Sequence, residues 1–189
     1  KGSGADVTYR LNNMDLAKSG FKKWNIEEDS CATFVNGIVI GSPHMPIMHA
    51  KNGEYKISQT RQNMSNGLYE LSLDNFCTNG GAQLVVNNVV TPAHNAANDD
   101  KKAPTSRSNI ATRFIRTDDY RQRVYGLVTD GKLNIALQGN LAEDESYYAG
   151  DLRVVYREKD SAVCVPVLES YVRMSQEIIA SKDVFYKGY

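Results

Sequence analysis

The chain has 189 residues, with 22 basic and 22 acidic side chains and a formal net charge of zero. Because no excess of positive charge attracts phosphates, this composition argues against nucleic acid or an anionic membrane surface as a partner. A hydrophobic content of 41% is ordinary for a globular protein. No apolar run reaches the roughly 20 residues that span a bilayer.

The first quarter of the chain is expected to be extended and irregular. Residues 6–24 form a short extended lead-in, and Trp24 opens the body of the domain. Residues 33–40 alternate apolar positions around an Asn-Gly turn signal. Residues 41–49 contain two prolines, which are excluded from central strands because proline lacks the N–H that pairs in a sheet. We interpret this last segment as a loop that crosses from one sheet to another.

The clearest strand pattern surrounds the turn signal Asn66-Gly67. Residues 54–60 and residues 68–75 each alternate between two faces. A period of two is typical of a strand with one buried face. Two such runs on either side of a short connection predict an antiparallel hairpin.

Two more hairpins are predicted further along. Residues 82–90 form an apolar strand that is broken at Asn87-Asn88, which is a turn signal. The strongest short-range signal is Asp130-Gly131, between strands predicted at 124–129 and 132–138.

The stretches between these hairpins also support an all-β fold. Residues 91–109 carry almost no large apolar side chain, so we predict a long exposed loop. Residues 140–146 are a polar connection to a final strand at 147–157. Many short strands separated by Gly, Asn and Asp turns predict an antiparallel β-sandwich.

The pattern changes after the last strand. From Pro166 to Ser181 the apolar residues recur at spacings of three and four, which predicts a short amphipathic helix. We therefore divide the chain into a β-sandwich at 1–160 and a helical extension or linker at 161–189. The helix either docks on the sandwich or joins it to a neighbouring domain.

The three cysteines, Cys31, Cys77 and Cys164, fit no metal spacing and leave at least one thiol unpaired. We interpret them as small buried hydrophobic residues, and a disulfide between two of them stays an open alternative. His44 and His49 are five residues apart in a proline-broken segment, which matches no helical ligand geometry. No metal site is assigned.

No catalytic residue is predicted. The sequence contains neither a Gly-x-Ser-x-Gly elbow nor a phosphate-binding glycine loop nor an HExxH motif. The acidic run at 143–145 is interpreted as a solvated turn, since catalytic carboxylates of glycosidases face each other across a cleft. We therefore expect a protein that is not an enzyme.

Seven short motifs follow one another between residues 5 and 156: ADVT, GFKKW, YKISQT, NGLYELSLDNF, LVVNN, DGKLNIALQG and YYAGDLRVVY. Their order resembles galactose-binding-like β-sandwich domains from secreted and surface proteins of Bacteroides-type bacteria. The chain departs from that pattern at Tyr147-Tyr148, where the family usually has Trp. It also departs at 150–152, where the family has Asp-Asn-Phe, and at Cys77-Thr78, where an aromatic-Arg pair is expected.

The resemblance implies a jelly-roll fold that binds carbohydrate without catalysis, secreted or on the bacterial outer surface. It also implies that a structural calcium ion accompanies the fold in some members. Calcium takes six to eight oxygen ligands, and the candidate carboxylates here are Asp151 with Asp6 or Asp29. No other cofactor is expected.

Carbohydrate binding needs aromatic faces and a few polar groups that fix orientation. The candidate ligand-binding residues are Trp24, Tyr120, Arg123, Tyr147 and Tyr148. Tyr147 and Tyr148 point to opposite faces of an extended chain, so at most one of them lines a site.

Each candidate also has a plain structural interpretation. Trp24 packs into the core in this alternative, and Arg121 and Arg123 pair with Asp118 and Asp119 on the surface. The competing function is a structural or protein-interaction module with no glycan ligand. Burial of the aromatic candidates favours that second function, and an exposed platform favours the first.

Overall fold

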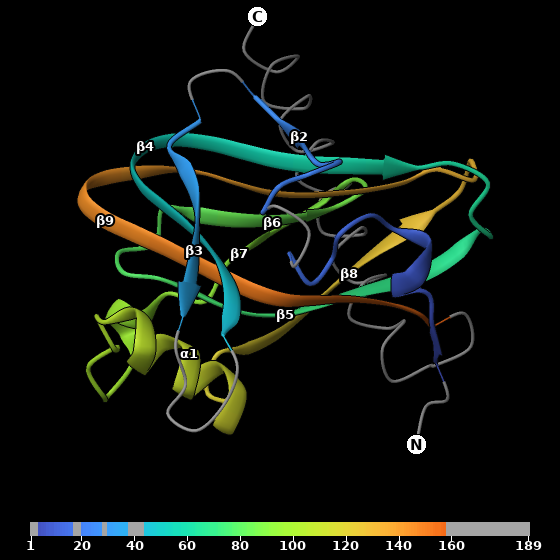
Figure 1. Ribbon diagram of the computed structural model, residues 1–189. Helices are drawn as coiled ribbons and strands as arrows, with labels where there is room; N and C mark the ends of the chain where they lie inside the picture. The colour runs from blue at the N-terminus through green and yellow to red at the C-terminus, as the bar shows by residue number, and fades with distance from the viewer. Residues whose placement is uncertain (1–3, 17–19, 28–29, 38–43, 158–189) are drawn as a thin grey trace, which may run out of the picture.

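The computed structural model describes residues 4–16, 20–27, 30–37 and 44–157 (Figure 1). Within these ranges the chain forms nine β-strands, one α-helix and two short 3₁₀ helices. The predicted C-terminal helix and the extension at 161–189 lie outside the described residues. In chain order the elements are β1 (Ala5–Asp6), η1 (Thr8–Arg10), β2 (Asn25–Ile26), β3 (Ala32–Gly37), β4 (Met45–Arg61), β5 (Gly67–Cys77), β6 (Ala82–Val86), β7 (Val89–Pro92), η2 (Ala96–Asn98), α1 (Arg107–Arg116), β8 (Arg121–Val128) and β9 (Leu133–Tyr156).

The strands form one antiparallel sheet that folds over itself into two layers. The two longest strands, β4 and β9, pair over most of their lengths, with an irregularity between Lys51 and Gly53. Figure 1 shows the two ribbons curving together. A bulge increases the local bend of a strand pair, and this one carries both strands from one layer of the sandwich to the other.

Each layer is completed by strands that pair with one half of β4 or β9. The first layer contains β2, the second half of β4, the first half of β9, β6 and β7. The second layer contains β3, the first half of β4, the second half of β9, β5 and β8, with β1 at the end of β9. The predicted antiparallel β-sandwich is confirmed.

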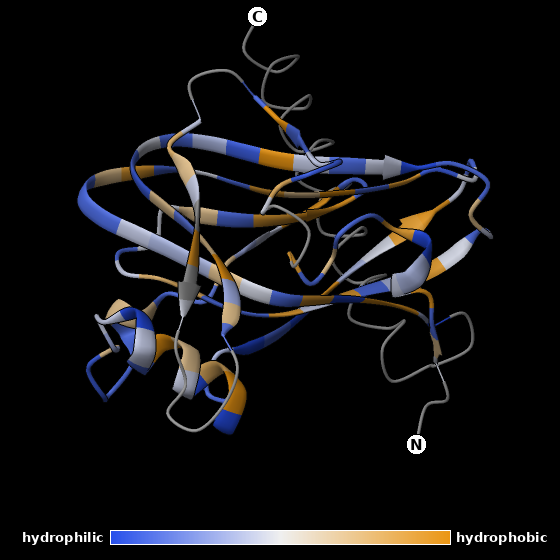
Figure 2. Ribbon diagram, viewed as in Figure 1, coloured by the Kyte–Doolittle hydropathy of each residue, from blue (hydrophilic) through white to orange (hydrophobic). Residues whose placement is uncertain are grey.

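The main core lies between the two layers. Because side chains alternate across a strand, every second residue of β4, β5 and β9 points inward, and Figure 2 shows the alternating bands of hydropathy along these strands. The inward positions of these three strands include Tyr55, Ile57, Tyr69, Leu71, Leu73, Ile135, Leu137 and Val154.

A second core lies on the outer face of the second layer, under α1. Ile110, Ala111 and Phe114 of the helix pack against Ile47 and Phe76 of the sheet. Each large apolar side chain that is buried in this way contributes about 2 kcal/mol. Helix α1 therefore belongs to the folded unit.

The sequence analysis missed this helix, because residues 91–109 were predicted to be a long exposed loop. Pro92 ends β7, residues 96–98 form η2, and α1 begins at Arg107. The local signal is Ser106, whose hydroxyl accepts a hydrogen bond from the N–H of Asn109 at 3.2 Å and so caps the helix. The interpretation of residues 41–49 as a loop was wrong for residues 45–49, since β4 begins at Met45, and residues 41–43 lie outside the described residues.

Two of the three predicted hairpins were wrong in their pairing. Among the described strands, β9 lies between β4 and β5, so these two do not pair, and β8 pairs with β5 rather than with β9. The turns at Asn66-Gly67 and Asp130-Gly131 connect strands that lie in opposite layers. The third hairpin, β6 and β7 around Asn87-Asn88, is confirmed.

Candidate functional site: a polar cleft on the first layer

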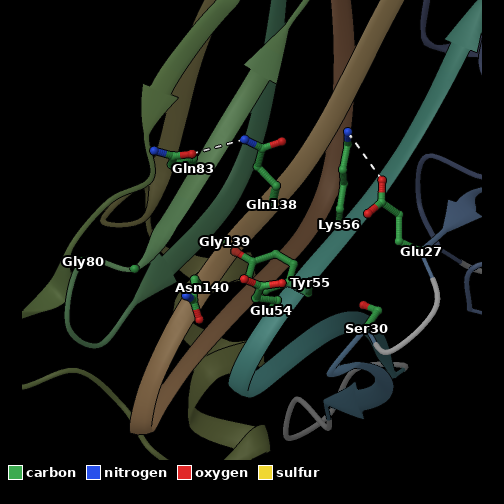
Figure 3. Close-up of a pocket in the computed structure, with 11 residues that line it drawn as sticks. Glu27, Ser30, Glu54, Tyr55, Lys56, Gly80, Gln83, Gln138, Gly139 and Asn140 are labelled. Carbon is green, nitrogen blue, oxygen red and sulfur yellow. Dashed lines mark hydrogen bonds and ion pairs between the residues drawn. The ribbon is translucent and has the colours of Figure 1, made fainter.

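A cleft lies on the outer face of the first layer, over β4, β9 and β6 (Figure 3). Its volume is about 550 Å³. Most of the side chains that β4, β6 and β9 contribute to the cleft alternate with the inward-facing core positions. The polar side chains around it are Glu27, Ser30, Glu54, Lys56, Gln83, Gln138 and Asn140.

The sheet register sets these side chains beside one another. Gln138 of β9 lies opposite Lys56 of β4 on one side and opposite Gln83 of β6 on the other. Glu54 lies opposite Asn140 two positions further along. Residues that are paired across strands project on the same face, so three neighbouring strands contribute to one polar surface.

Some of the polar groups in the cleft bind one another. Gln138 Nε2 donates a hydrogen bond to Gln83 Oε1 at 3.2 Å, and Lys56 Nζ lies 3.6 Å from Glu27 Oε1. Both contacts are visible in Figure 3. An amide carries two N–H donors and a carbonyl acceptor, so these side chains keep further donors and acceptors for a ligand.

Glycines form one wall of the cleft, where the turn before β6 approaches β9 closely. A Cβ atom at Gly139 would lie only 2.4 Å from the carbonyl oxygen of Gly81, so a side chain at this position would push the two segments apart. Asn140 N–H donates to that same carbonyl at 3.0 Å. The wall is therefore built from backbone and fixed in place.

Tyr55 also contacts the cleft, although its side chain is only 3% exposed. Its hydroxyl has no hydrogen-bond partner among the described residues. Burial raises the pKa of Tyr55 well above its ordinary value of 10.0, so the phenol stays neutral. The ring stacks on Tyr147, with 5.6 Å between the ring centroids.

The charges around the cleft are few and mixed. Glu27 and Glu54 carry negative charge, Lys56 carries positive charge, and the other polar lining side chains are neutral. Such a surface offers hydrogen bonds without a strong field for anions or cations. Its chemistry suits a neutral ligand that is rich in hydroxyl groups.

The predicted ligand-binding residues lie elsewhere. Trp24 is buried in the main core, where its Nε1 donates to the carbonyl of Asn13 at 3.1 Å. Tyr147 is fully buried, and its hydroxyl donates to Asn75 Oδ1 at 3.0 Å. Tyr120 is buried in the second core against Phe76. None of these three rings has a face open to solvent.

Tyr148 and Arg123 are more exposed but lie on the second layer. Tyr148 is half-buried, and His49 stacks on its ring with a centroid distance of 4.4 Å. Arg123 Nε lies 3.6 Å from Glu70 Oε1 on the outer face of this layer. The structure therefore does not bring the five predicted residues together in one site.

The predicted surface ion pairs have different partners in the structure. Arg121 Nη1 lies 3.3 Å from Asp74 Oδ2 and 3.1 Å from Asp151 Oδ2. Asp119 pairs instead with Arg113 at 2.7 Å. The pairing of Arg121 with Asp74 was missed because Asp74 is 47 residues away in sequence.

The candidate calcium ligands do not form a cation site in the part of the chain that is described. Asp151 has one carboxylate oxygen on Arg121 and the other on Arg153 at 3.4 Å. Asp6 accepts a hydrogen bond from the N–H of Thr8, and Asp29 lies outside the described residues. Two guanidinium groups on one carboxylate oppose a cation at Asp151, and calcium binding stays an untested prediction.

The histidines and cysteines form no metal cluster among the residues that the structure describes. His49 Nε2 lies 3.0 Å from Ser146 Oγ, and His94 Nε2 lies 2.8 Å from Asp99 Oδ2. Cys77 is a buried free thiol, in agreement with its interpretation as a small hydrophobic residue, and Cys31 is half-buried and free. No described helix is long and apolar enough to span a membrane.

Comparison with solved structures identifies the fold as the jelly-roll β-sandwich of carbohydrate-binding modules. A family 61 carbohydrate-binding module in complex with β-1,4-galactotriose aligns with a TM-score of 0.53 and 12% identity, over 79% of this chain and 98% of that module. A family 16 carbohydrate-binding module aligns with a TM-score of 0.46 and 14% identity, over 77% of this chain and 98% of that chain.

A further similar structure is the enzymatically active domain of tailspike protein 4 from bacteriophage CBA120. It aligns with a TM-score of 0.49 and 10% identity, over 77% of this chain and 21% of that chain. No protein-family model matches the sequence, and no curated protein is significantly similar to it. At these identities the comparisons concern the fold.

The cleft residues were missed by the sequence analysis, which searched for aromatic side chains. The sequence did contain a signal, because polar residues alternate with apolar residues in two of the strands. These polar residues are Glu54 and Lys56 in one strand and Gln138 and Asn140 in the other. That signal resembles any solvated strand face, because alternation places polar residues outward whether or not they bind a ligand.

Proposed function

We propose that the protein is a non-catalytic carbohydrate-binding module that holds a neutral glycan in the cleft over β4, β9 and β6. The observation that carries this proposal is the row of Lys56, Gln138 and Gln83, which lie side by side on three neighbouring strands. Planar amides hydrogen-bond to sugar hydroxyls as both donors and acceptors. The jelly-roll fold supports the proposal, although fold alone does not determine function.

The proposal assigns no reaction to the cleft. The amides of Gln83 and Gln138 bind hydroxyl groups but neither transfer protons nor attack a glycosidic bond, and the proposal gives the carboxylates of Glu27 and Glu54 a binding role only. Glu27 is paired with Lys56 at 3.6 Å, which suits it to binding. A location outside the cell, on a secreted or surface protein, is part of the same proposal and rests on the resemblance of the motifs.

Binding in this cleft is expected to be weak and polar. Its lining contains no exposed aromatic ring among the described residues, so hydrogen bonds supply most of the specificity. Each hydrogen bond contributes about 0.5 to 1.5 kcal/mol net. A small oligosaccharide is therefore expected to bind with micromolar to millimolar affinity.

The second candidate function is a structural or protein-interaction module. The burial of Trp24, Tyr120 and Tyr147 favours it, since aromatic rings that fill a core are unavailable to a ligand. On this alternative the polar cleft is a solvated sheet face without a partner.

The test is a glycan array, followed by calorimetric titration that starts with β-1,4-galactotriose. The double variant Gln83→Ala with Gln138→Ala is expected to weaken binding about tenfold, because two hydrogen bonds are lost. Gln62→Ala is the control, since Gln62 is an exposed amide away from the cleft. The absence of binding across neutral glycans would support the structural module instead, and unchanged affinity in the double variant would remove the cleft from the proposal.

A further inference from the structure

Tyr9 is the most exposed large hydrophobic side chain of the described residues, at 82%. It occupies the middle of η1, close to the N-terminus, and Figure 1 shows this segment on the opposite side of the molecule from α1. One exposed aromatic residue is common on a protein surface. Tyr9 differs from an isolated surface residue in two respects, which are its anchored backbone and the polar hollow beside its ring.

The turn that presents Tyr9 is anchored on both sides. Thr8 Oγ1 accepts a hydrogen bond from Val154 N–H of β9 at 2.9 Å, and Thr8 N–H donates to Asp6 Oδ1 at 2.9 Å. On the other side Arg10 Nη2 donates to the carbonyl of Asn63 at 2.8 Å. The ring is therefore carried by a fixed backbone, which lowers the entropy that binding costs.

A hollow of about 340 Å³ lies beside the ring. Its polar lining includes Asp6, Asn13, Asp15, Asp151 and Arg153. The Arg153 side chain is 56% exposed, and its Nε contacts Asp151 Oδ1 at 3.4 Å. A guanidinium has five N–H donors, so Arg153 keeps donors that face solvent while its carboxylate partner holds it in place.

The charges of the hollow select against acidic ligands. The hollow is lined by three carboxylates, those of Asp6, Asp15 and Asp151, and by the guanidinium of Arg153. The hydrogen bond from Thr8 and the nearby Arg153 hold the pKa of Asp6 below its usual 3.8, so this carboxylate is an acceptor at neutral pH. A ligand with hydroxyl groups and no negative charge meets both donors and acceptors here.

We propose that Tyr9 is the stacking platform of a second carbohydrate subsite, in which a neutral sugar ring lies on the phenol and its hydroxyls bind Arg153 and Asp6. This inference deepens the proposed function and rests on it for the class of ligand. The subsite lies near Val154 at the end of β9, in the second layer, whereas the cleft lies over Gln138 in the first layer. Two separate sites on one module increase the apparent affinity for a polymer.

The test is affinity electrophoresis of the full chain through native gels that contain galactan, mannan, xylan, β-glucan or polygalacturonate. Tyr9→Ala is expected to reduce retention by a neutral polysaccharide about fivefold or more, and Tyr9→Phe is expected to keep it, because the ring is what stacks. Both variants should unfold at the wild-type temperature, since Tyr9 is exposed. Polygalacturonate should retain the protein least.

The outcomes separate this inference from the proposed function. If Tyr9→Ala is retained like the wild type while the double variant at Gln83 and Gln138 is not, the second subsite is overturned and the cleft stands. The reverse result supports the subsite and overturns the cleft. A protein that no neutral polysaccharide retains overturns both. Retention of Tyr9→Phe as weak as that of Tyr9→Ala would overturn the stacking role.

Discussion

The carboxylate of Glu145 accepts a hydrogen bond from the backbone N–H of Gly81 at 2.8 Å, although 64 residues separate them in sequence. The same oxygen accepts from Asn79 N–H at 3.0 Å, and the other oxygen accepts from Ala142 N–H at 3.0 Å. Glu145 is only 3% exposed. It therefore fixes the bend of β9 against the glycine wall of the cleft.

The first prediction concerns this buried carboxylate. Glu145→Ala leaves three backbone N–H groups without their acceptor, and each unsatisfied buried donor costs about 1 kcal/mol or more. We expect a loss of about 3 kcal/mol in the free energy of unfolding, measured by urea denaturation, and weaker glycan binding. Glu143→Ala is the matched control, because Glu143 belongs to the same acidic run and is exposed. Equal stability of the two variants would contradict the anchoring role.

That acidic run shows where sequence patterns reach their limit. Glu143 and Asp144 are exposed, as the interpretation of a solvated turn requires, but Glu145 is buried. Of these three residues, only Glu145 has hydrogen bonds to the turn at residues 79–81, which is distant in sequence and is contained in no local pattern. The residue that holds the cleft wall was for this reason assigned to solvent.

Strand faces were more predictable than strand partners. The alternation in residues 54–60 and 68–75 correctly marked Tyr55, Ile57, Leu71 and Leu73 as buried positions. The expectation of a single buried face was wrong for β5, whose polar phase, Glu70, Ser72 and Asp74, is buried as well. A two-residue period indicates which residues share a face of the strand, but it does not identify the strand that pairs with them. The bend in β4 and β9 decides the pairing, and it sends consecutive strands into opposite layers.

The site was less predictable than the fold. An aromatic residue in a strand can either pack in the core or lie exposed and stack on a ligand, and the sequence does not distinguish the two. Tyr147 and Tyr148 were expected to point to opposite faces, and Tyr147 is indeed buried in the main core while Tyr148 packs on the second. Tyr9, in contrast, precedes all of the predicted hairpins and had no strand pattern to mark it.

The second prediction concerns Asp74, whose side chain is 6% exposed beside Arg121. Burial raises the pKa of Asp74 from 3.8 to about 6, and Arg121 only partly opposes this effect. The folded state then binds a proton more tightly than the unfolded state, so stability falls as pH rises through the window from about 4 to 6. Two pKa units correspond to about 3 kcal/mol.

Asp74→Asn removes the titration, because asparagine stays neutral. Thermal unfolding from pH 4 to pH 7 should show that the stability of the wild type decreases relative to the variant over this window. The comparison uses the shapes of the two pH profiles, since the variant also loses its charged contact with Arg121. Parallel profiles would show that Asp74 has an ordinary pKa in the folded protein.

The third prediction has the opposite sign and concerns His49. Burial lowers the pKa of His49 below its usual 6.5, and the charges of Lys51 and Arg107 lower it further. The unfolded state then takes up a proton first as pH falls, so the protein loses stability as pH falls below about 6.5. His49→Gln keeps a polar group near Ser146 and cannot titrate. Its stability should exceed that of the wild type increasingly between pH 6.5 and pH 5, measured as the difference in unfolding midpoint.

The fourth prediction concerns Asn87, which joins the β6–β7 hairpin to the two neighbouring strand ends. Its Nδ2 donates to the carbonyl of Leu127 at 2.7 Å and to that of Lys132 at 3.1 Å, and its Oδ1 accepts from Asn134 N–H at 2.7 Å. The backbone of Asn87 has a φ of 51°, a left-handed conformation that asparagine and glycine tolerate best.

Two substitutions at this position separate the side-chain bonds from the backbone conformation. Asn87→Gly loses the three hydrogen bonds and keeps the turn, whereas Asn87→Ala loses the bonds and also strains the turn by about 1 kcal/mol. We expect urea denaturation to rank stability as wild type, then Asn87→Gly, then Asn87→Ala, with losses of about 2 and 3 kcal/mol. The neighbouring Asn88→Ala serves as control, since Asn88 is exposed. If Asn87→Gly is as stable as the wild type, backbone conformation alone explains the choice of asparagine, and the hairpin is held to β8 and β9 by its core contacts.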